Sequence, residues 1–151
     1  MRHVSGALFA LLLLIGPLAT AAAAWPGNER TRPHALEGGW RLVGTLAEDE
    51  DVIEPPARGF EEYKVVADGY FIWTAIQDGR VTGTAGGVAR MGSRTYTERV
   101  DYASESRLAW IVGHRHAFQW SIRNGLWYHT GTLRGGGGMS ARVAEVWERV
   151  R

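Results

Sequence analysis

The fold is decided by residues 60–103, which run FEEYKVVADGYFIWTAIQDGRVTGTAGGVARMGSRTYTERVDYA. The pairs Asp68-Gly69 and Asp78-Gly79 divide this stretch into segments rich in Val, Ile, Thr and aromatic residues. Asp-Gly supplies the positive φ angles of two-residue hairpin turns, and β-branched and aromatic residues favour strands. The stretch therefore predicts consecutive antiparallel strands joined by tight turns.

The same pattern continues to the end of the chain. Further turn sequences lie at Gly92-Ser93, Asn124-Gly125 and 135–138, and all five prolines lie at or before Pro56. Central strands exclude proline because the ladder needs each backbone N–H, and no segment shows a sustained helical period. We predict strands at 39–47, 60–67, 70–77, 80–91, 93–103, 107–112, 115–123, 126–134 and 139–150, with an acidic loop at 48–56.

About eight to nine short strands joined by hairpins predict an all-β fold, a single antiparallel up-and-down β-barrel whose closure removes the sheet edges. A β-sandwich is the second alternative, because sandwiches need longer crossovers than these turns provide. The chain of 151 residues, 45% of them hydrophobic, is long enough for one domain.

Charge and cysteine content exclude several classes of function. The formal net charge is +1, so no basic excess points to a nucleic acid or an acidic membrane surface. The absence of cysteine excludes disulfide frameworks, thiolate zinc sites and cysteine nucleophiles.

The first residues are typical of a secretory signal. A basic start, Met1-Arg2-His3, precedes an apolar run at 7–18 and small residues at 19–24. The apolar run is shorter than the about 20 residues that span a bilayer. We predict a signal peptide at 1–24, an N-terminal extension at 25–37 and a barrel domain at 38–151. The product is then exported, periplasmic or secreted, with no membrane span after signal removal.

Alternation along the strands predicts which side chains face the barrel interior. In segment 95–102 the face with Arg99 and Asp101 is plainly solvent-facing, so Glu98 should point inward with Tyr96 and Tyr102. Strand 70–77 is apolar on both faces, and the N-terminal segment or a second subunit is expected to cover its outer side. A homodimer through this outer face follows as one alternative.

The alternation in the later strands places more aromatic residues with these. Phe118 and Trp120 share one face of segment 115–123, and Glu145 shares a face with Trp147. For the last strand, alternation leaves open which face is inside.

Several motifs then resemble those of a family of small exported bacterial proteins with a lipocalin-like domain. The residues that carry the resemblance are Gly38-Gly39-Trp40, 63–66, 71–73, Gly86-Gly87, 92–98, Tyr102, Phe118, 127–131 and 145–149. The resemblance implies a small calycin-type barrel, closed at one end by Trp40 under Arg149, and it brings no settled activity. Val88 stands in a region where many members carry a tyrosine.

Glu98 is the most informative single residue. An inward carboxylate must be paired, hydrogen-bonded or protonated, because burying it alone costs several kcal/mol or more. One interpretation is a structural ion pair with Arg149 or Arg123, or hydrogen bonds to tyrosine hydroxyls. The other is a polar anchor in a ligand pocket.

Two further ionisable residues accompany it. Glu145 is a second inward candidate, and a pair of carboxyl groups can serve as acid and base where their pKa values differ. His129 shares a face with Trp127, so it either binds a ligand from inside or lies on the surface. His114 and His116 lack an obvious third metal ligand, and haem on one histidine has equally little support. We expect neither a metal nor a cofactor.

The aromatic residues either fill an eight-stranded barrel completely or line a cavity in it. We favour an exported binding protein for a small, mostly apolar ligand. The alternatives are a cofactor-free enzyme that transfers a proton in the same pocket, and a packed structural or partner-binding envelope protein. The predicted ligand-binding residues are Trp73, Tyr96, Glu98, Tyr102, Trp120, His129, Glu145 and Trp147.

Overall fold

The computed structural model describes residues 34–47 and 52–150. The predicted signal peptide at 1–24 and most of the extension at 25–37 lie outside the described residues. The strands are β1 Gly38–Leu46, β2 Ile53–Glu54, β3 Phe60–Ala67, β4 Tyr70–Gln77, β5 Arg80–Met91, β6 Thr95–Ala103, β7 Arg115–Arg123, β8 Leu126–Arg134 and β9 Ser140–Arg149. Two 3₁₀ helices, η1 Ser106–Ile111 and η2 Gly136–Gly138, complete the described elements.

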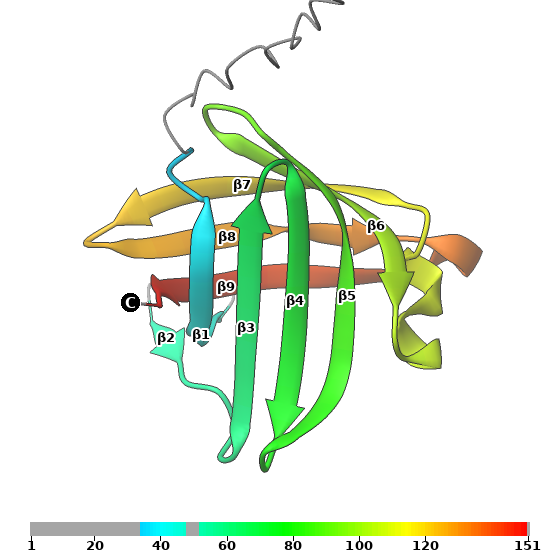
Figure 1. Ribbon diagram of the computed structural model, residues 1–151, viewed down its shortest axis with the longest axis horizontal. Coiled ribbons are helices and arrows are strands. Elements are labelled where there is room, and N and C mark those ends of the chain that lie inside the picture. The colour runs from blue at the N-terminus through cyan, green and yellow to red at the C-terminus, as the bar shows by residue number, and fades with distance from the viewer. Residues whose placement is uncertain (1–33, 48–51, 151) are drawn as a thin grey trace, which may run out of the picture. The chain divides into compact units, whose positions relative to one another are not determined.

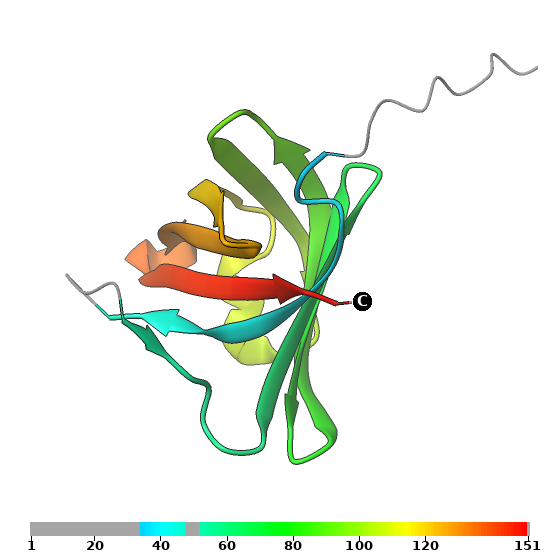
Figure 2. The same ribbon diagram turned by 90° about the vertical axis from the view of Figure 1, so that its left-hand side faces the viewer.

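The strands form a closed antiparallel barrel. Their order is β2-β1-β3-β4-β5-β6-β7-β8-β9, and β1 also pairs with β9, so eight strands close on themselves and β2 extends from β1. In Figure 1, β3 to β5 cross steeply over β7 to β9, and Figure 2 shows β1 beside β9 where the barrel closes. The prediction of a single antiparallel up-and-down barrel is confirmed. Neither described helix is long and apolar enough to cross a bilayer.

The predicted hairpin turns have the expected backbone. Asp68, Asp78 and Asn124 have φ angles of 49°, 50° and 53°, and the glycine after each also has a positive φ. Two consecutive positive φ angles define the type I′ turn, whose twist matches that of the flanking strands. These short turns fix the neighbour-to-neighbour order of the barrel.

The strand predicted at 107–112 is wrong, because this segment forms η1. Leu108 and Ile111 are three residues apart, and residues at this spacing lie on one side of a 3₁₀ turn. Ile111 is buried and Leu108 packs against the core. The predicted acidic loop at 48–56 contains the short strand β2, and residues 48–51 lie outside the described part of the chain.

One end of the barrel is closed by aromatic residues. The Trp40 indole donates a hydrogen bond from Nε1 to the Leu36 carbonyl oxygen at 2.8 Å, and the Arg149 guanidinium lies 4.3 Å from the centroid of its ring. Trp127 and Trp147 are fully buried beside it. The Trp40–Arg149 pair implied by the resemblance is therefore present.

The inward orientation predicted for Tyr102 is wrong. The register shifts from Gly86–Tyr102 to Gly87–Val100, so β6 carries one extra residue. Such a bulge interrupts the alternation, and Tyr102 is 46% exposed while Val100 stays buried. A Cβ atom at Gly87 would collide with the Arg99 carbonyl oxygen, which explains the glycine at this point.

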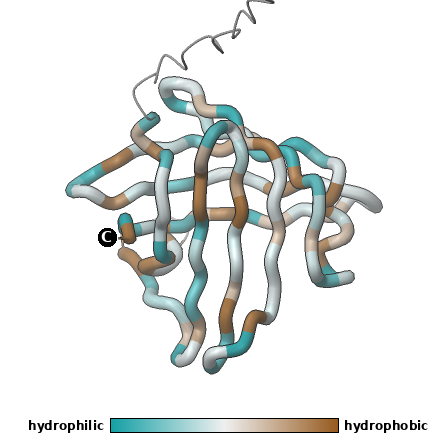
Figure 3. Tube along the Cα trace, viewed as in Figure 1, coloured by the Kyte–Doolittle hydropathy of each residue, from teal (hydrophilic) through white to brown (hydrophobic). Residues whose placement is uncertain are grey.

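The outer face of β4 stays exposed within the described chain. Tyr70 is 64% exposed and Ile72 is 41% exposed. Figure 3 shows hydrophobic and hydrophilic residues mixed along the strands, as expected where successive side chains point to opposite faces. Cover by a second copy of the chain stays a prediction.

Candidate functional site

A cavity of about 200 Å³ lies inside the barrel. Its polar lining comes from four strands, β3, β6, β8 and β9, and its apolar lining comes mainly from β4, β6, η1 and β7 to β9. The lining residues are Glu62, Lys64, Trp73, Glu98, Val100, Leu108, Ile111, Phe118, His129, Leu133, Val143 and Glu145. Aromatic side chains thus fill the closed end of the barrel, and a cavity remains beside them.

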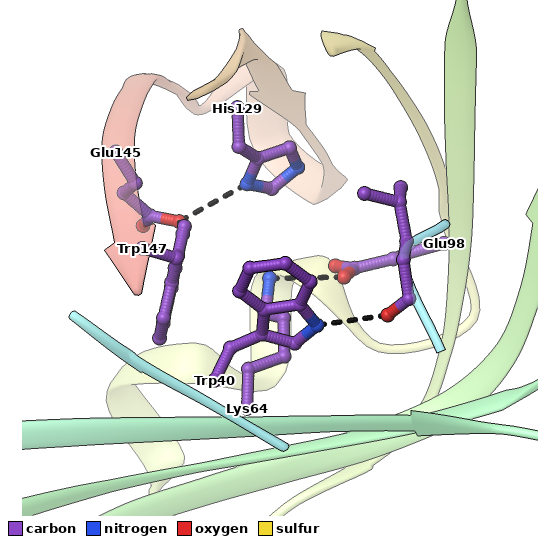
Figure 4. A network of polar contacts seen from close by, with 7 residues as sticks. Trp40, Lys64, Glu98, His129, Glu145 and Trp147 are labelled. Atoms are coloured by element: carbon purple, nitrogen blue, oxygen red, sulfur yellow. Dashed lines mark hydrogen bonds and ion pairs between the residues drawn. The ribbon is translucent and has the colours of Figure 1, made fainter. Parts of the chain in front are cut away.

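A buried ion pair crosses the interior. Lys64 Nζ lies 3.0 Å from Glu98 Oε1, and the two side chains are only 3% and 5% exposed (Figure 4). Glu98 therefore points inward as predicted, but its ion-pair partner is Lys64 rather than an arginine. Arg149 stacks on Trp40 instead, and Arg123 lies over the Tyr128 ring.

Lys64 is positively charged in this environment. Burial alone would lower the pKa of its amine, but the nearby charges of Glu98 and Glu145 outweigh burial and raise it. The ammonium also lies 5.1 Å from the centroid of the Trp147 ring and 5.6 Å from that of Trp127. Aromatic faces attract a cation, so the ring cluster contributes to holding this charge.

A second polar pair lies on β8 and β9. His129 Nδ1 and Glu145 Oε2 are 3.1 Å apart, and the Trp147 indole donates to the same carboxylate oxygen at 3.2 Å. Burial and the Lys64 charge lower the pKa of His129. Burial alone would raise the pKa of Glu145, but the hydrogen bond with His129 and the Lys64 charge hold it below its usual range.

These directions assign the proton between the two groups. His129 is neutral and Glu145 is ionised, so the imidazole donates from Nδ1 and presents Nε2 as a hydrogen-bond acceptor.

The sequence left open whether His129 and Glu145 face the interior or the surface. Both side chains point into the barrel and line the cavity.

Glu62 is the third carboxyl group on the cavity wall. Burial raises its pKa to about 8, and the charges of Glu145 and Glu98 add to this effect against the opposing charge of Lys64. Glu62 is therefore mostly protonated at neutral pH. The cavity wall thus carries a protonated Glu62, an ionised Glu145 and the Lys64–Glu98 ion pair.

Several buried polar atoms near this cluster have no hydrogen-bond partner among the described residues. They are Tyr96 Oη, His116 Nε2, Trp127 Nε1 and His129 Nε2. Buried polar groups are normally hydrogen-bonded, because leaving one unsatisfied costs about 1–3 kcal/mol. Of the four residues only His129 also lines the cavity, and its Nε2 is itself buried.

The structure brings most of the predicted site residues together. Trp73, Glu98, His129 and Glu145 line the cavity. Tyr96 and Trp147 lie next to it and present their ring faces to the Lys64 ammonium.

The remaining two predicted residues lie elsewhere. Tyr102 is on the outside of the barrel. Trp120 packs against His34 and donates its indole N–H to the Gly92 carbonyl oxygen, outside the cavity lining.

Two site residues, Glu62 and Lys64, are absent from the sequence prediction. Alternation along β3 places them on one face with Phe60 and Val66, but the opposite face carries an equal mixture of polar and apolar residues. One available signal is composition, since Lys64 is the only lysine among 17 basic residues.

The two histidines considered as metal ligands, His114 and His116, lie in different environments. His114 is exposed while His116 is buried, so the two do not converge. Within residues 34–47 and 52–150, no group of three His, Asp or Glu side chains is placed to hold a metal ion.

No family model matches the sequence, and no curated protein is significantly similar to it.

Proposed function

We propose that the protein binds a small, mostly apolar molecule in the barrel cavity and fixes its polar end with the ionisable cluster. The observation that carries this proposal is the cavity of about 200 Å³, with apolar walls on one part and Glu62, Glu98, His129 and Glu145 on another. Ligand pockets typically combine apolar walls with a few convergent polar groups.

The size of the cavity limits the ligand. An apolar protein cavity of about 150 Å³ accommodates benzene. A cavity of about 200 Å³ therefore favours a ring or short chain with one polar substituent over a long-chain lipid. The indole of Trp73 lies on the cavity wall and supplies a fluorescence signal for binding.

The experiment compares two identical substitutions at different places. In Val143→Phe the larger side chain fills the cavity, whereas in Val81→Phe it lies on the barrel exterior, where Val81 is 65% exposed. Titration with aromatic amines, alcohols and acids should give saturable tryptophan quenching in the wild type and in Val81→Phe, and none in Val143→Phe. A folded wild type that binds none of these ligands would contradict the proposal, as would a Val143→Phe variant that binds normally.

A lipocalin-like, exported character belongs to the same proposal. Its support is the closed eight-stranded barrel with Trp40 stacked under Arg149, together with the signal-like sequence at 1–24. Expression in a bacterium followed by mass determination of the periplasmic product should give a chain that starts near residue 25. A chain that stays intact in the cytoplasm would contradict export.

Proton transfer is a second candidate function, favoured by one observation. Two carboxyl groups of the same cavity have opposite shifts, the pKa of Glu62 being raised to about 8 and that of Glu145 lowered. Such a split is what an acid and a base in one site require. Solvent deuterium exchange at the α-carbon of small aldehydes and ketones, followed by NMR, should then depend on Glu145 and disappear in Glu145→Gln.

A further inference from the structure

The charges on the cavity wall are unbalanced. Three carboxyl groups, Glu62, Glu98 and Glu145, face one ammonium, Lys64, and one imidazole, His129. Lys64 and Glu98 neutralise each other at 3.0 Å. Glu145 is hydrogen-bonded only to neutral groups, the His129 imidazole and the Trp147 indole, and Glu62 lies in the negative field of the other two carboxylates. The wall therefore carries a net negative charge that its own residues do not balance.

The hydrogen-bonding groups on the cavity wall that remain for a ligand are mainly acceptors. The neutral His129 imidazole uses its one N–H, at Nδ1, on Glu145, so it has no free donor for a bound molecule. Glu145 Oε1 is a further acceptor, and Glu62 accepts through both oxygens once it loses its proton. A bound group that satisfies this wall must donate hydrogen bonds and carry positive charge.

We propose that the polar end of the ligand is a primary or secondary ammonium group that donates hydrogen bonds to Glu62 and Glu145. Its apolar body lies against Leu108, Leu133 and Val143. This inference rests on the proposed binding function and specifies the ligand class. A quaternary ammonium would supply the charge without the N–H donors, and a carboxylate would add to the existing negative charge.

Binding of a cation at this place is coupled to release of a proton. Among the residues of the cavity wall Glu62 carries a proton at neutral pH, because burial, Glu145 and Glu98 disfavour its ionised form while only Lys64 favours it. An ammonium beside Glu62 reverses that balance, so Glu62 ionises and its proton passes to the solvent. Below a pKa of about 8 the amine affinity then rises by about tenfold for each pH unit, since amine and proton compete for one carboxylate.

The experiment uses three probes that share a ring and differ in the head group: 2-phenylethylamine, 2-phenylethanol and phenylacetate. Isothermal titration of the full chain at pH 7, in phosphate and in Tris, measures the affinity and the number of protons released. The amine should bind at least about tenfold more tightly than the alcohol and release close to one proton, and phenylacetate should bind weakest. At pH 9 the proton release should approach zero.

Glu62→Gln and its neighbour Glu61→Gln form a matched pair of variants. The two residues are adjacent on β3, and Glu61 is exposed on the outer face. Glu62→Gln should abolish the proton release and lower the amine affinity at pH 8.5 by about tenfold, while the alcohol affinity is unchanged. Glu61→Gln should behave as the wild type. Because neutral glutamine resembles the protonated Glu62, the variant is expected to fold.

The outcomes separate this inference from the proposed function. If the alcohol or phenylacetate binds as tightly as the amine, or the amine binds without proton release, the ammonium assignment is overturned and the binding function stands. If the folded wild type binds none of the three probes, both are overturned. The pH dependence of the wild type tests the assignment even where a variant misfolds.

Discussion

The Lys64 ammonium and the Glu98 carboxylate lie 3.0 Å apart inside the barrel and join β3 to β6, two strands that β4 and β5 separate in the sheet. Such a pair is not by itself a large source of stability, because removing two charges from water costs about as much as their attraction returns. Each buried charge nevertheless needs the other as its counter-ion, because an unpaired charge inside the barrel is costly.

Removing one partner should therefore destabilise the protein strongly. In Lys64→Met the buried Glu98 carboxylate loses its counter-ion, and the free energy of unfolding at pH 7 should fall by about 3–5 kcal/mol. The double variant Lys64→Met/Glu98→Gln should recover a large part of this loss. Urea titration measures both values.

The exposed pair Arg99–Asp101 on β6 provides the control. Both side chains are more than 40% exposed, so Arg99→Met should cost at most about 1 kcal/mol. Equal losses of unfolding free energy in the Lys64 and Arg99 variants would show that burial of the Lys64–Glu98 pair does not cause the destabilisation.

Glu62 should make the protein less stable as the pH rises. Its pKa is about 8 in the folded chain against an ordinary value of 4.5, so between these values the unfolded chain has lost a proton that the folded chain keeps. For this group alone, the free energy of unfolding then falls with pH at up to about 1.4 kcal/mol per unit. Relative to the wild type, Glu62→Gln should gain stability from pH 5 to pH 8. Chemical unfolding at several pH values measures this difference, and a difference independent of pH would contradict it.

The barrel could be predicted because its determinants are local. Type I′ turns at Asp68-Gly69, Asp78-Gly79 and Asn124-Gly125 depend on two residues each, and neighbouring strands joined by such turns pair in chain order. The segment 107–112 misled because a short apolar run has no period that separates a strand from a 3₁₀ turn. The extra residue of β6 opposite Gly86-Gly87 reversed the exposure of Tyr102, and simple alternation along β6 contains no signal for such a bulge.

The site could be predicted only in part, for a related reason. Glu98 stood out because its own strand has a clearly polar outer face. Lys64 and Glu62 lie on a strand with polar residues on both faces, so their orientation follows from the register with β1 and β4. The partner of Glu98 is Lys64 on β3, and β4 and β5 lie between the two strands in the sheet. No local sequence pattern predicts such a long-range contact.

Gly87 should be essential for the bulge between β5 and β6. In Gly87→Ala the new Cβ atom would meet the Arg99 carbonyl oxygen, part of the backbone of the paired strand, so β6 must shift. We expect the free energy of unfolding to fall by about 1–3 kcal/mol. In Gly136→Ala the added methyl group has no heavy atom within 4 Å, so this variant should differ from the wild type by less than about 0.5 kcal/mol. Thermal unfolding of the two variants side by side would contradict the argument if they melted together.

Arg149 should hold the closed end of the barrel through its shape as well as its charge. Its guanidinium stacks 4.3 Å from the centroid of the Trp40 ring and donates to the carbonyl oxygens of Glu37 at 2.6 Å and Ala35 at 2.8 Å. Lysine keeps the charge but lacks the planar fork that makes these contacts together. Arg149→Lys should therefore lower the free energy of unfolding by about 1–2 kcal/mol and alter the near-UV circular dichroism of the buried tryptophans.

The same substitution at the exposed Arg134, where neither contact exists among the described residues, should change stability by less than about 0.5 kcal/mol. If both lysine variants retained full stability and the wild-type spectrum, charge alone would suffice at position 149. Stacking of the Arg149 guanidinium on the Trp40 ring would then not be required to close this end of the barrel.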